Sequence, residues 1–186
     1  MAKKLENLLI YQIHDRQLLK YASKHFSGKL VDIGCGTKPY KALLIHIVQE
    51  HIGVDHHETL HDKSNIDRFG TAYEIPADDG EFDCALCTAV LEHLEEPEMA
   101  LRECFRVLKP GGIAIYSVPF IWHLHEEPRD FYRFSKYGLK YLFEKVGFEI
   151  IEIKPMLYNL FCKFNKGYNS QWNKKTLNGR KENYTL

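Results

Sequence analysis

Two glycines at the end of an apolar run are the first residues of this chain whose spacing suggests chemistry. The stretch VDIGCGTKPY, Val31 to Tyr40, joins that run to Gly34 and Gly36. Glycine adopts backbone angles that other residues avoid, and its missing side chain lets a ligand lie against the main chain. Taken alone, the two glycines are equally consistent with a tight strand-to-helix turn that binds nothing.

A carboxylate further along the chain favours a ligand. Asp55 ends the next apolar stretch, HIGVD. It follows Asp32 at about the distance at which nucleotide-binding folds place an acid that accepts hydrogen bonds from ribose hydroxyls. The alternative for Asp55 is a solvated residue at the end of a strand.

The glycine stretch lacks the features that bind phosphates. A dinucleotide-binding loop has a third glycine at the position of Pro39, where proline removes an N–H and fills space. The chain also lacks the glycine-rich sequence of a P-loop. Asp32, just before the glycines, is suited to contact an ammonium group. The sequence therefore predicts a ligand with a ribose and a cationic centre but no phosphates.

Two other patterns contain side chains of the kind that bind metals. Cys84 and Cys87 form C-x-x-C, but they lie in the apolar run FDCALCTAV, where residues three apart point to opposite faces of a strand. Core packing is therefore expected rather than a redox pair or half a zinc site. His56, His57 and the segment His123 to Glu127 have no second cluster at recognisable spacing, so no metal site is predicted.

The elements that must position these residues alternate between strands and helices. Strands are expected at KLVDIG, HIGVD, EFDCALCTAV, GIAIYSVP and FEIIEIKP, and helices over residues 7–26, 40–50, 96–108 and 135–147. Ser135 is the expected cap of the last helix, and Gly147 follows its end. This βαβ repetition with near-continuous apolar strands predicts an α/β fold, a doubly wound, mostly parallel sheet with helices on both faces.

Size and composition are typical of one globular domain. The chain has 186 residues, of which 45% are hydrophobic and 27% charged, and its formal net charge of zero gives no case for a nucleic-acid partner. No window is long and apolar enough for a membrane span, and the N-terminal segment does not resemble a signal peptide. The five cysteines are expected to be reduced thiols, which favours a cytoplasmic location.

The last part of the chain differs in character. From Lys163 onward six Lys or Arg residues accompany one acid, and apolar periodicity is lost. We expect one domain over residues 1–162 and a basic, poorly ordered tail over residues 163–186. A polyanion contact is the less favoured interpretation of the tail.

The motifs VDIGCGT, IGVD, IPADDGEFDCALCTAVLEHLEEPEMALRECFRVLKPGG and IAIYSVPF resemble the successive motifs of class I S-adenosylmethionine-dependent methyltransferases. The similarity covers roughly residues 29–155, and HLHEEPRDFYRFSKYGL is similar to a bacterial, methyltransferase type 11-like branch associated with glycan and small-molecule modification. The resemblance implies a Rossmann-like sheet with S-adenosylmethionine as cofactor. The family sheet ends with an antiparallel strand, which only Asn159 to Phe164 could supply here, and the sequence leaves open whether this strand is present or is missing or irregular.

The resemblance also implies roles for individual residues. Asp32, Gly34 and Gly36 match the motif around the methionine part of the cofactor, and Asp55 matches the acid that binds the ribose hydroxyls. Lys38 stands where the family often has a third glycine. The other matched cofactor-binding residues are Cys35 between the glycines, His56 beside the adenine, Thr71 and Ala72 at the adenine edge, and Cys87 and Thr88 beneath the sulfonium.

Methyl transfer is an in-line displacement that depends on alignment, and it needs a base only when the acceptor is a hydroxyl or a protonated amine. His93, in the family's LEH turn, and His125 are the candidate bases. The candidate substrate-binding residues lie in HEEPRDFYRFS, where a lid over the acceptor is expected, and they are Glu126, Arg129, Tyr132 and Arg133. The alternative for this segment is a structured loop whose Arg and Asp residues pair with each other.

We therefore expect methyl transfer from S-adenosylmethionine to a small-molecule or sugar acceptor. One alternative is a catalytically inactive S-adenosylmethionine-binding module that acts as an interaction protein, which a missing last strand would favour. A second is a nicotinamide-dependent reductase, against which Pro39 and the LEH segment argue.

Overall fold

Strands and helices alternate along the chain, as the sequence predicts. The structure, a computed structural model, describes residues 2–59, 62–156 and 159–167, with side chains from residue 12 onward except that of Met156. The strands are β1 (Lys29–Ile33), β2 (Glu50–Asp55), β3 (Arg68–Phe69), β4 (Phe82–Thr88), β5 (Leu108–Pro119), β6 (Phe148–Met156) and β7 (Asn159–Lys166). The helices are α1 (Ala2–His25), α2 (Lys41–Leu44), α3 (Pro97–Val107) and α4 (Lys136–Val146), with short 3-10 turns η1 (Lys63–Asn65) and η2 (Leu91–His93).

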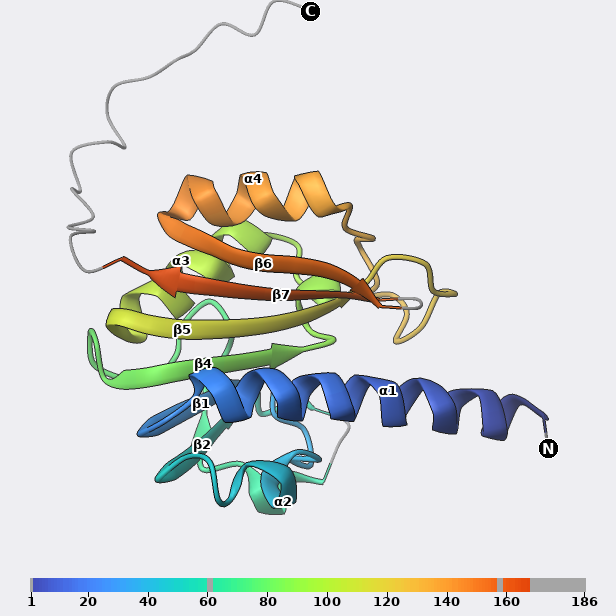
Figure 1. The fold of residues 1–186 in the computed structure, drawn as a ribbon, viewed down its shortest axis with the longest axis horizontal. Helices are drawn as coiled ribbons and strands as arrows, with labels where there is room; N and C mark the ends of the chain where they lie inside the picture. The colour runs from blue at the N-terminus through green and yellow to red at the C-terminus, as the bar shows by residue number, and fades with distance from the viewer. Residues whose placement is uncertain (1, 60–61, 157–158, 168–186) are drawn as a thin grey trace, which may run out of the picture.

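The strands form one seven-stranded sheet in the order β3-β2-β1-β4-β5-β7-β6 (Figure 1). The first five strands of the chain pair in parallel, whereas β7 runs antiparallel to both β5 and β6. Strand order reverses between β1 and β4, where Asp32 pairs with Leu86. In doubly wound sheets ligands bind at the carboxyl ends of the strands beside such a reversal.

Helices cover both faces of the sheet, as predicted. On one face α1 and α2 pack with the sheet around Leu18, Leu44 and Leu86, and on the other face α3 and α4 pack around Leu101 and Phe143. Figure 1 shows α1 running beside β1 and β4, with its N-terminal half extending beyond the carboxyl end of β4.

The C-x-x-C pair lies in the core, which confirms the prediction. Cys84 belongs to the face under α1 and Cys87 to the face under α3 and α4, and both thiols are free and buried. The alternation of side chains along β4 therefore separates the two sulfur atoms across the sheet.

Local capping explains where α4 begins and ends. The Ser135 side chain accepts a hydrogen bond from the backbone N–H of Gly138 at 3.0 Å, and Gly147 ends the helix with a φ of +110°. Both agree with the sequence. The helix predicted over residues 40–50 is wrong in length, because α2 ends at Leu44 and the Gln49 N–H already donates to the Gly28 carbonyl that precedes β1.

Strand β7 is present and pairs regularly with β5, so the alternative of a missing or irregular last strand, which the sequence left open, does not hold. It pairs residue by residue with β5 from Asn159 to Asn165. Its alternation buries Leu160, Cys162 and Phe164 on the α3–α4 face. The strand runs to Lys166, past the expected domain end at residue 162, and the tail over residues 168–186 lies outside the described residues.

Among the described helices, none has both the length and the apolar character needed to cross a bilayer.

We predict that Phe164→Ala lowers the free energy of unfolding by about 3–5 kcal/mol, since it removes a fully buried ring. Phe164 stacks on Phe143 with centroids 3.4 Å apart and 6° between the ring planes. Urea denaturation followed by circular dichroism measures the change. Ile151→Ala, on the exposed side of neighbouring β6, is the control and should stay within about 0.5 kcal/mol. An equally small effect of Phe164→Ala would contradict the placement of β7.

Candidate functional site

A cavity of about 400 Å³ lies at the carboxyl ends of β1, β4 and β5. Three segments supply most of its lining: Asp32, Gly34, Cys35, Gly36, Thr37, Pro39 and Tyr40; Thr88, Ala89, Glu92 and His93; and Ser117, Pro119, Trp122, His125 and Glu126. His14 of α1 and Asn159 of β7 complete it. The volume is in the range of small-molecule sites, and the position is the one expected at a strand-order reversal.

The glycine loop, residues 34–40, needs both glycines for its shape. Gly34 and Gly36 have φ angles of +68° and +51°. A Cβ atom on Gly34 would lie 2.5 Å from the Val90 side chain, so close approach as well as backbone angle requires glycine there. The Gly34 N–H donates to the Val54 carbonyl at 2.9 Å, and the Gly36 N–H donates to Asp55 Oδ2 at 2.8 Å. The end of β2 therefore holds the loop in place.

The side chain of Lys38, a residue of this loop, packs beneath the loop backbone and stabilises it, a role that the sequence did not predict. Its side chain is buried, and its Nζ donates to the His51 carbonyl at 3.0 Å and forms an ion pair with Asp67. Gly53, in the middle of β2, leaves room for it, since a Cβ there would overlap the Lys38 side chain. The glycine of HIGVD therefore serves the loop and not the ligand directly.

Asp32 is a buried carboxylate in the wall of the cavity. It is 2% exposed, and its Oδ2 accepts a hydrogen bond from His51 Nε2 at 2.9 Å. Burial raises the pKa of the Asp32 carboxyl above its ordinary value, although the hydrogen bond from His51 opposes the shift. A cationic ligand group in the cavity would stabilise the charged form of this carboxylate.

The residues matched to the adenosine part of the cofactor lie outside the described lining of the cavity, and so does Cys87, which was matched to the position beneath the sulfonium. Asp55 accepts from the Gly36 N–H through Oδ2 and from the His56 N–H through Oδ1, at 2.8 and 2.7 Å. Thr71 accepts from the N–H groups of residues 73 and 74 within its own turn. Ala72 packs against the core, and Cys87 is buried in it. The cavity thus joins the glycine loop and Thr88 to the segments that carry His93 and His125.

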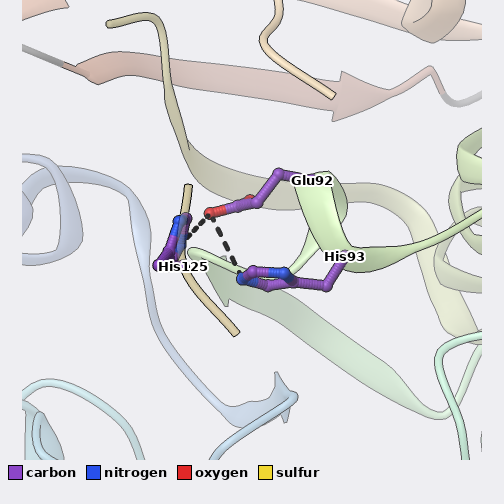
Figure 2. Close-up of side chains that lie close together, drawn as sticks. All are labelled: Glu92, His93 and His125. Atoms are coloured by element: carbon purple, nitrogen blue, oxygen red, sulfur yellow. Dashed lines mark ion pairs between the residues drawn. The ribbon is translucent and has the colours of Figure 1, made fainter. Parts of the chain in front are cut away.

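Three side chains that line the cavity converge on one another (Figure 2). Glu92 and His93 come from η2, and His125 comes from the β5–α4 loop, residues 120–135. Glu92 Oε1 lies 3.9 Å from His93 Nε2 and 4.0 Å from His125 Nε2. The sequence predicted no metal site because it showed no partner for the histidines after β5. The tertiary structure brings the LEH turn to that position.

Glu92 is the least expected member of this group. Its side chain is fully buried, and both carboxylate oxygens are without a hydrogen-bond partner in the described part of the chain. Burial raises the pKa of Glu92 to about 8. A carboxyl group in this state is a sign of a functional site, since an unpaired buried acid is unfavourable for folding.

Both histidines are held by their Nδ1 atoms. His93 Nδ1 lies 2.5 Å from the Arg129 carbonyl. His125 Nδ1 lies 3.3 Å from the His123 carbonyl and 3.4 Å from Asp130 Oδ2. Oxygen acceptors at Nδ1 favour the tautomer with the proton there, which leaves the Nε2 lone pair of each ring directed toward Glu92.

The β5–α4 loop docks onto η2 through the backbone. The N–H groups of Phe131 and Tyr132 both donate to the Glu92 carbonyl, at 2.9 and 3.2 Å. Arg133 donates to both oxygens of Asp130 and to three carbonyls of the loop, which uses all five of its N–H groups and holds the pKa of the Asp130 carboxyl well below its usual range. The pairing of Arg and Asp within this segment, the alternative interpretation, is confirmed for these two residues.

The candidate substrate-binding residues are therefore divided. Glu126 lines the cavity, with Oε2 3.7 Å from His93 Nε2. Tyr132 directs its hydroxyl to the Glu95 carbonyl at 2.9 Å, and Arg129 contributes its backbone carbonyl to His93. These two residues and Arg133 lie outside the described lining and stabilise the loop.

Several lining residues were missed by sequence reasoning. His14 Nε2 lies 2.8 Å from Ser117 Oγ, which joins α1 to the end of β5, and burial lowers the pKa of His14. Trp122 and Asn159 enter from the β5–α4 loop and from β7. Glu92 lies in the LEH turn, which the resemblance places close to the cofactor and the acceptor.

Comparison with known proteins agrees with this geometry. A family described as "Methyltransferase domain" matches residues 31–116. The demethylmenaquinone methyltransferase of Staphylococcus carnosus is 26% identical, with 81% of each chain covered. The ubiquinone biosynthesis O-methyltransferase of Pseudomonas aeruginosa is 26% identical over 79% of this chain, which spans only 53% of that protein. A solved methyltransferase from Aquifex aeolicus has the same fold, with a TM-score of 0.67, 18% identity, and 82% of this chain and 89% of that chain covered.

The fold and the site define a Rossmann-like α/β enzyme whose cavity opens beside a glycine loop and a buried carboxylate. Residues 31–116 carry the methyltransferase domain of the class I S-adenosylmethionine-dependent enzymes, as the resemblance implied. S-adenosylmethionine is its methyl donor. The residues present suit that cofactor, because the loop offers bare backbone and Asp32 offers a buried carboxylate for the ammonium group.

We predict that Gly34→Ala weakens S-adenosylmethionine binding at least tenfold, since it adds a clash with Val90 to the strain of a positive φ. Isothermal titration calorimetry measures the affinity. Gly80→Ala is the matched control, because Gly80 has a φ of +66° but its nearest neighbour would lie 3.8 Å from the new Cβ. Val90→Ala in the Gly34→Ala background should restore part of the affinity. Unchanged binding in Gly34→Ala would contradict the loop geometry.

Proposed function

We propose that the chain transfers the methyl group of S-adenosylmethionine to a hydroxyl of a small molecule, sugars included, by in-line displacement. One observation carries the proposal: a single cavity joins the loop matched to the methionine part of the cofactor with His93 and His125. The cofactor supplies a methyl group already activated by a sulfonium. The protein then has to align donor and acceptor and to remove the hydroxyl proton.

On the donor side, Asp32 and the backbone of the glycine loop hold the methionine part. Asp55 binds the ribose hydroxyls. Its oxygens already accept from Gly36 and His56 N–H groups, but each carboxylate oxygen has a second lone pair for a further donor. His56, Thr71 and Ala72 border the adenine in this proposal, and Thr88 lies nearest the sulfonium at the end of β4.

On the acceptor side, His93 or His125 takes the proton, and Trp122 offers an apolar wall. Two relatives support a small molecule as acceptor, since one is named for demethylmenaquinone and the other for O-methylation in ubiquinone biosynthesis. The net charge of zero offers no support for a nucleic-acid acceptor. A cytoplasmic location forms part of the proposal, supported by five buried free thiols.

The inactive binding module remains the second candidate, but the structure contradicts the main argument for it. That interpretation depended on a missing last strand that would open the acceptor pocket. Strand β7 is present, and Asn159 at its start forms part of the cavity wall.

We predict that S-adenosylmethionine and S-adenosylhomocysteine bind and that Asp55→Ala weakens both at least a hundredfold, because the variant loses the ribose acceptor and the support of the Gly36 N–H. Calorimetric titration measures this, with NADH as a ligand expected not to bind. Asp62→Ala is the control, since its exposed carboxylate caps η1 through the Ser64 N–H. Equal affinity in wild type and Asp55→Ala would contradict the assigned role of Asp55.

An assay of methyl transfer distinguishes an active enzyme from the inactive binding module. The protein is incubated with S-adenosylmethionine carrying a labelled methyl group and a panel of catechols, other phenols and sugars, and label in each acceptor is counted. Methylation of a hydroxyl in the panel supports the proposal. Tight cofactor binding without transfer to any of these hydroxyl acceptors favours the module instead.

A further inference from the structure

We propose that Glu92, His93 and His125 form a binding site for a divalent metal ion of the zinc class, with an open position that faces the cavity. An acceptor hydroxyl would bind at that open position. The ion site rests on the three side chains alone, and only the assignment of the acceptor hydroxyl rests on the proposed function.

The three ligand atoms are already gathered. One carboxylate oxygen and two imidazole nitrogens lie within 4.8 Å of one another (Figure 2). Ligands placed 2.0–2.1 Å from a tetrahedral ion are about 3.3 Å apart, so side-chain shifts on the order of 1 Å would complete the site. The residues come from two segments that the backbone bonds of the Glu92 carbonyl hold together.

Glu92 provides an independent indication of a ligand. Its carboxyl group is fully buried, is directed toward both imidazole rings, and has no hydrogen-bond donor within reach among the described residues. Leaving a buried acceptor unsatisfied normally costs about 1–3 kcal/mol. A cation between the three side chains would satisfy this carboxylate without any change in fold.

The surroundings of the histidines match those of metal ligands. A metal-binding histidine usually donates its other ring N–H to a carbonyl or a carboxylate, which fixes the tautomer and the ring orientation. His93 has the Arg129 carbonyl at Nδ1, and His125 has Asp130 and the His123 carbonyl there. Arg133 holds Asp130 in turn. Both Nε2 atoms are thereby left as ligands that face Glu92.

The donor set selects the class of ion. Two imidazoles and one carboxylate suit zinc and similar transition metals, whereas magnesium and calcium prefer oxygen ligands. Two histidines and one glutamate leave one tetrahedral position for water or substrate. All three residues line the cavity, so that position opens toward the acceptor side. A hydroxyl bound to such an ion would have a lowered pKa and would release its proton to water, so with the ion bound His93 and His125 serve as ligands and not as the base.

The test is direct metal binding to the full chain after chelator treatment and dialysis. Zn²⁺ is titrated by calorimetry, and Co²⁺ is titrated by its visible absorption, which responds to ligand type and geometry. We expect one ion per chain. His93→Ala, His125→Ala and Glu92→Gln should each weaken binding at least tenfold, while His123→Ala, in the same loop but outside the three ligands, should change it less than twofold. Thermal unfolding without metal shows whether each variant is folded.

Three results would overturn the site. The first is no binding at an ion concentration of about 100 µM, at which only weak surface sites would remain empty. The others are binding that survives in His93→Ala and His125→Ala, or a loss of binding in His123→Ala equal to that in these two variants. Catechol added to the Co²⁺ form should change the absorption spectrum if a position is open, and an unchanged spectrum would remove the acceptor from the inference. Calorimetry with S-adenosylmethionine on the metal-free protein measures cofactor binding independently of metal binding. Cofactor binding without metal binding would overturn only this inference, whereas metal binding without cofactor binding would overturn only the proposed function.

Discussion

Parallel pairing of β1 with β4 is the constraint on which the rest of the structure depends. Because Leu30 to Asp32 pair with Cys84 to Leu86, the segments that follow the two strands leave the sheet side by side and in the same direction. One becomes the glycine loop and the other becomes η2. Strand order reverses here, so helices leave toward opposite faces and a crevice remains between them. The cavity, the buried Asp32 and the side chains of η2 all occupy this one edge of the sheet.

Buried ionisable groups at that edge are arranged in two ways. Beneath the glycine loop each charged group has a partner: Lys38 pairs with Asp67, and Asp32 accepts from His51. On the acceptor side Glu92 is buried without a comparable partner among the described residues, although two imidazoles face it. Paired charges fix the loop as a rigid support for the cofactor, whereas an unpaired buried carboxylate has a cost that folding alone does not explain. The difference separates the support of the glycine loop from the proposed metal site.

Elements distant in the sequence close the cavity. Antiparallel pairing of β7 with β5 brings Asn159 to the same edge as the carboxyl ends of the parallel strands, and α1 brings His14 against Ser117. The β5–α4 loop is shaped by its own Arg133–Asp130 pair and anchored to the Glu92 carbonyl. Because these contacts fix the loop, His125 is held in place before any acceptor binds. This preorganisation is what an alignment-dependent displacement requires of the protein.

The sequence by itself determined the strand–helix alternation, the glycine loop, Ser135 as a helix cap, and the opposite faces of Cys84 and Cys87, because short-range periodicity and the backbone freedom of glycine decide these locally. Its motifs also indicated the family. Only the tertiary structure decided that Lys38 lies beneath the loop and that β7 is complete. It also decided that Glu92, His93 and His125 converge, because each of these depends on contacts between segments far apart in the chain. A strand rich in lysine and asparagine such as β7 has weak local preference, and its pairing with β5 decides its conformation.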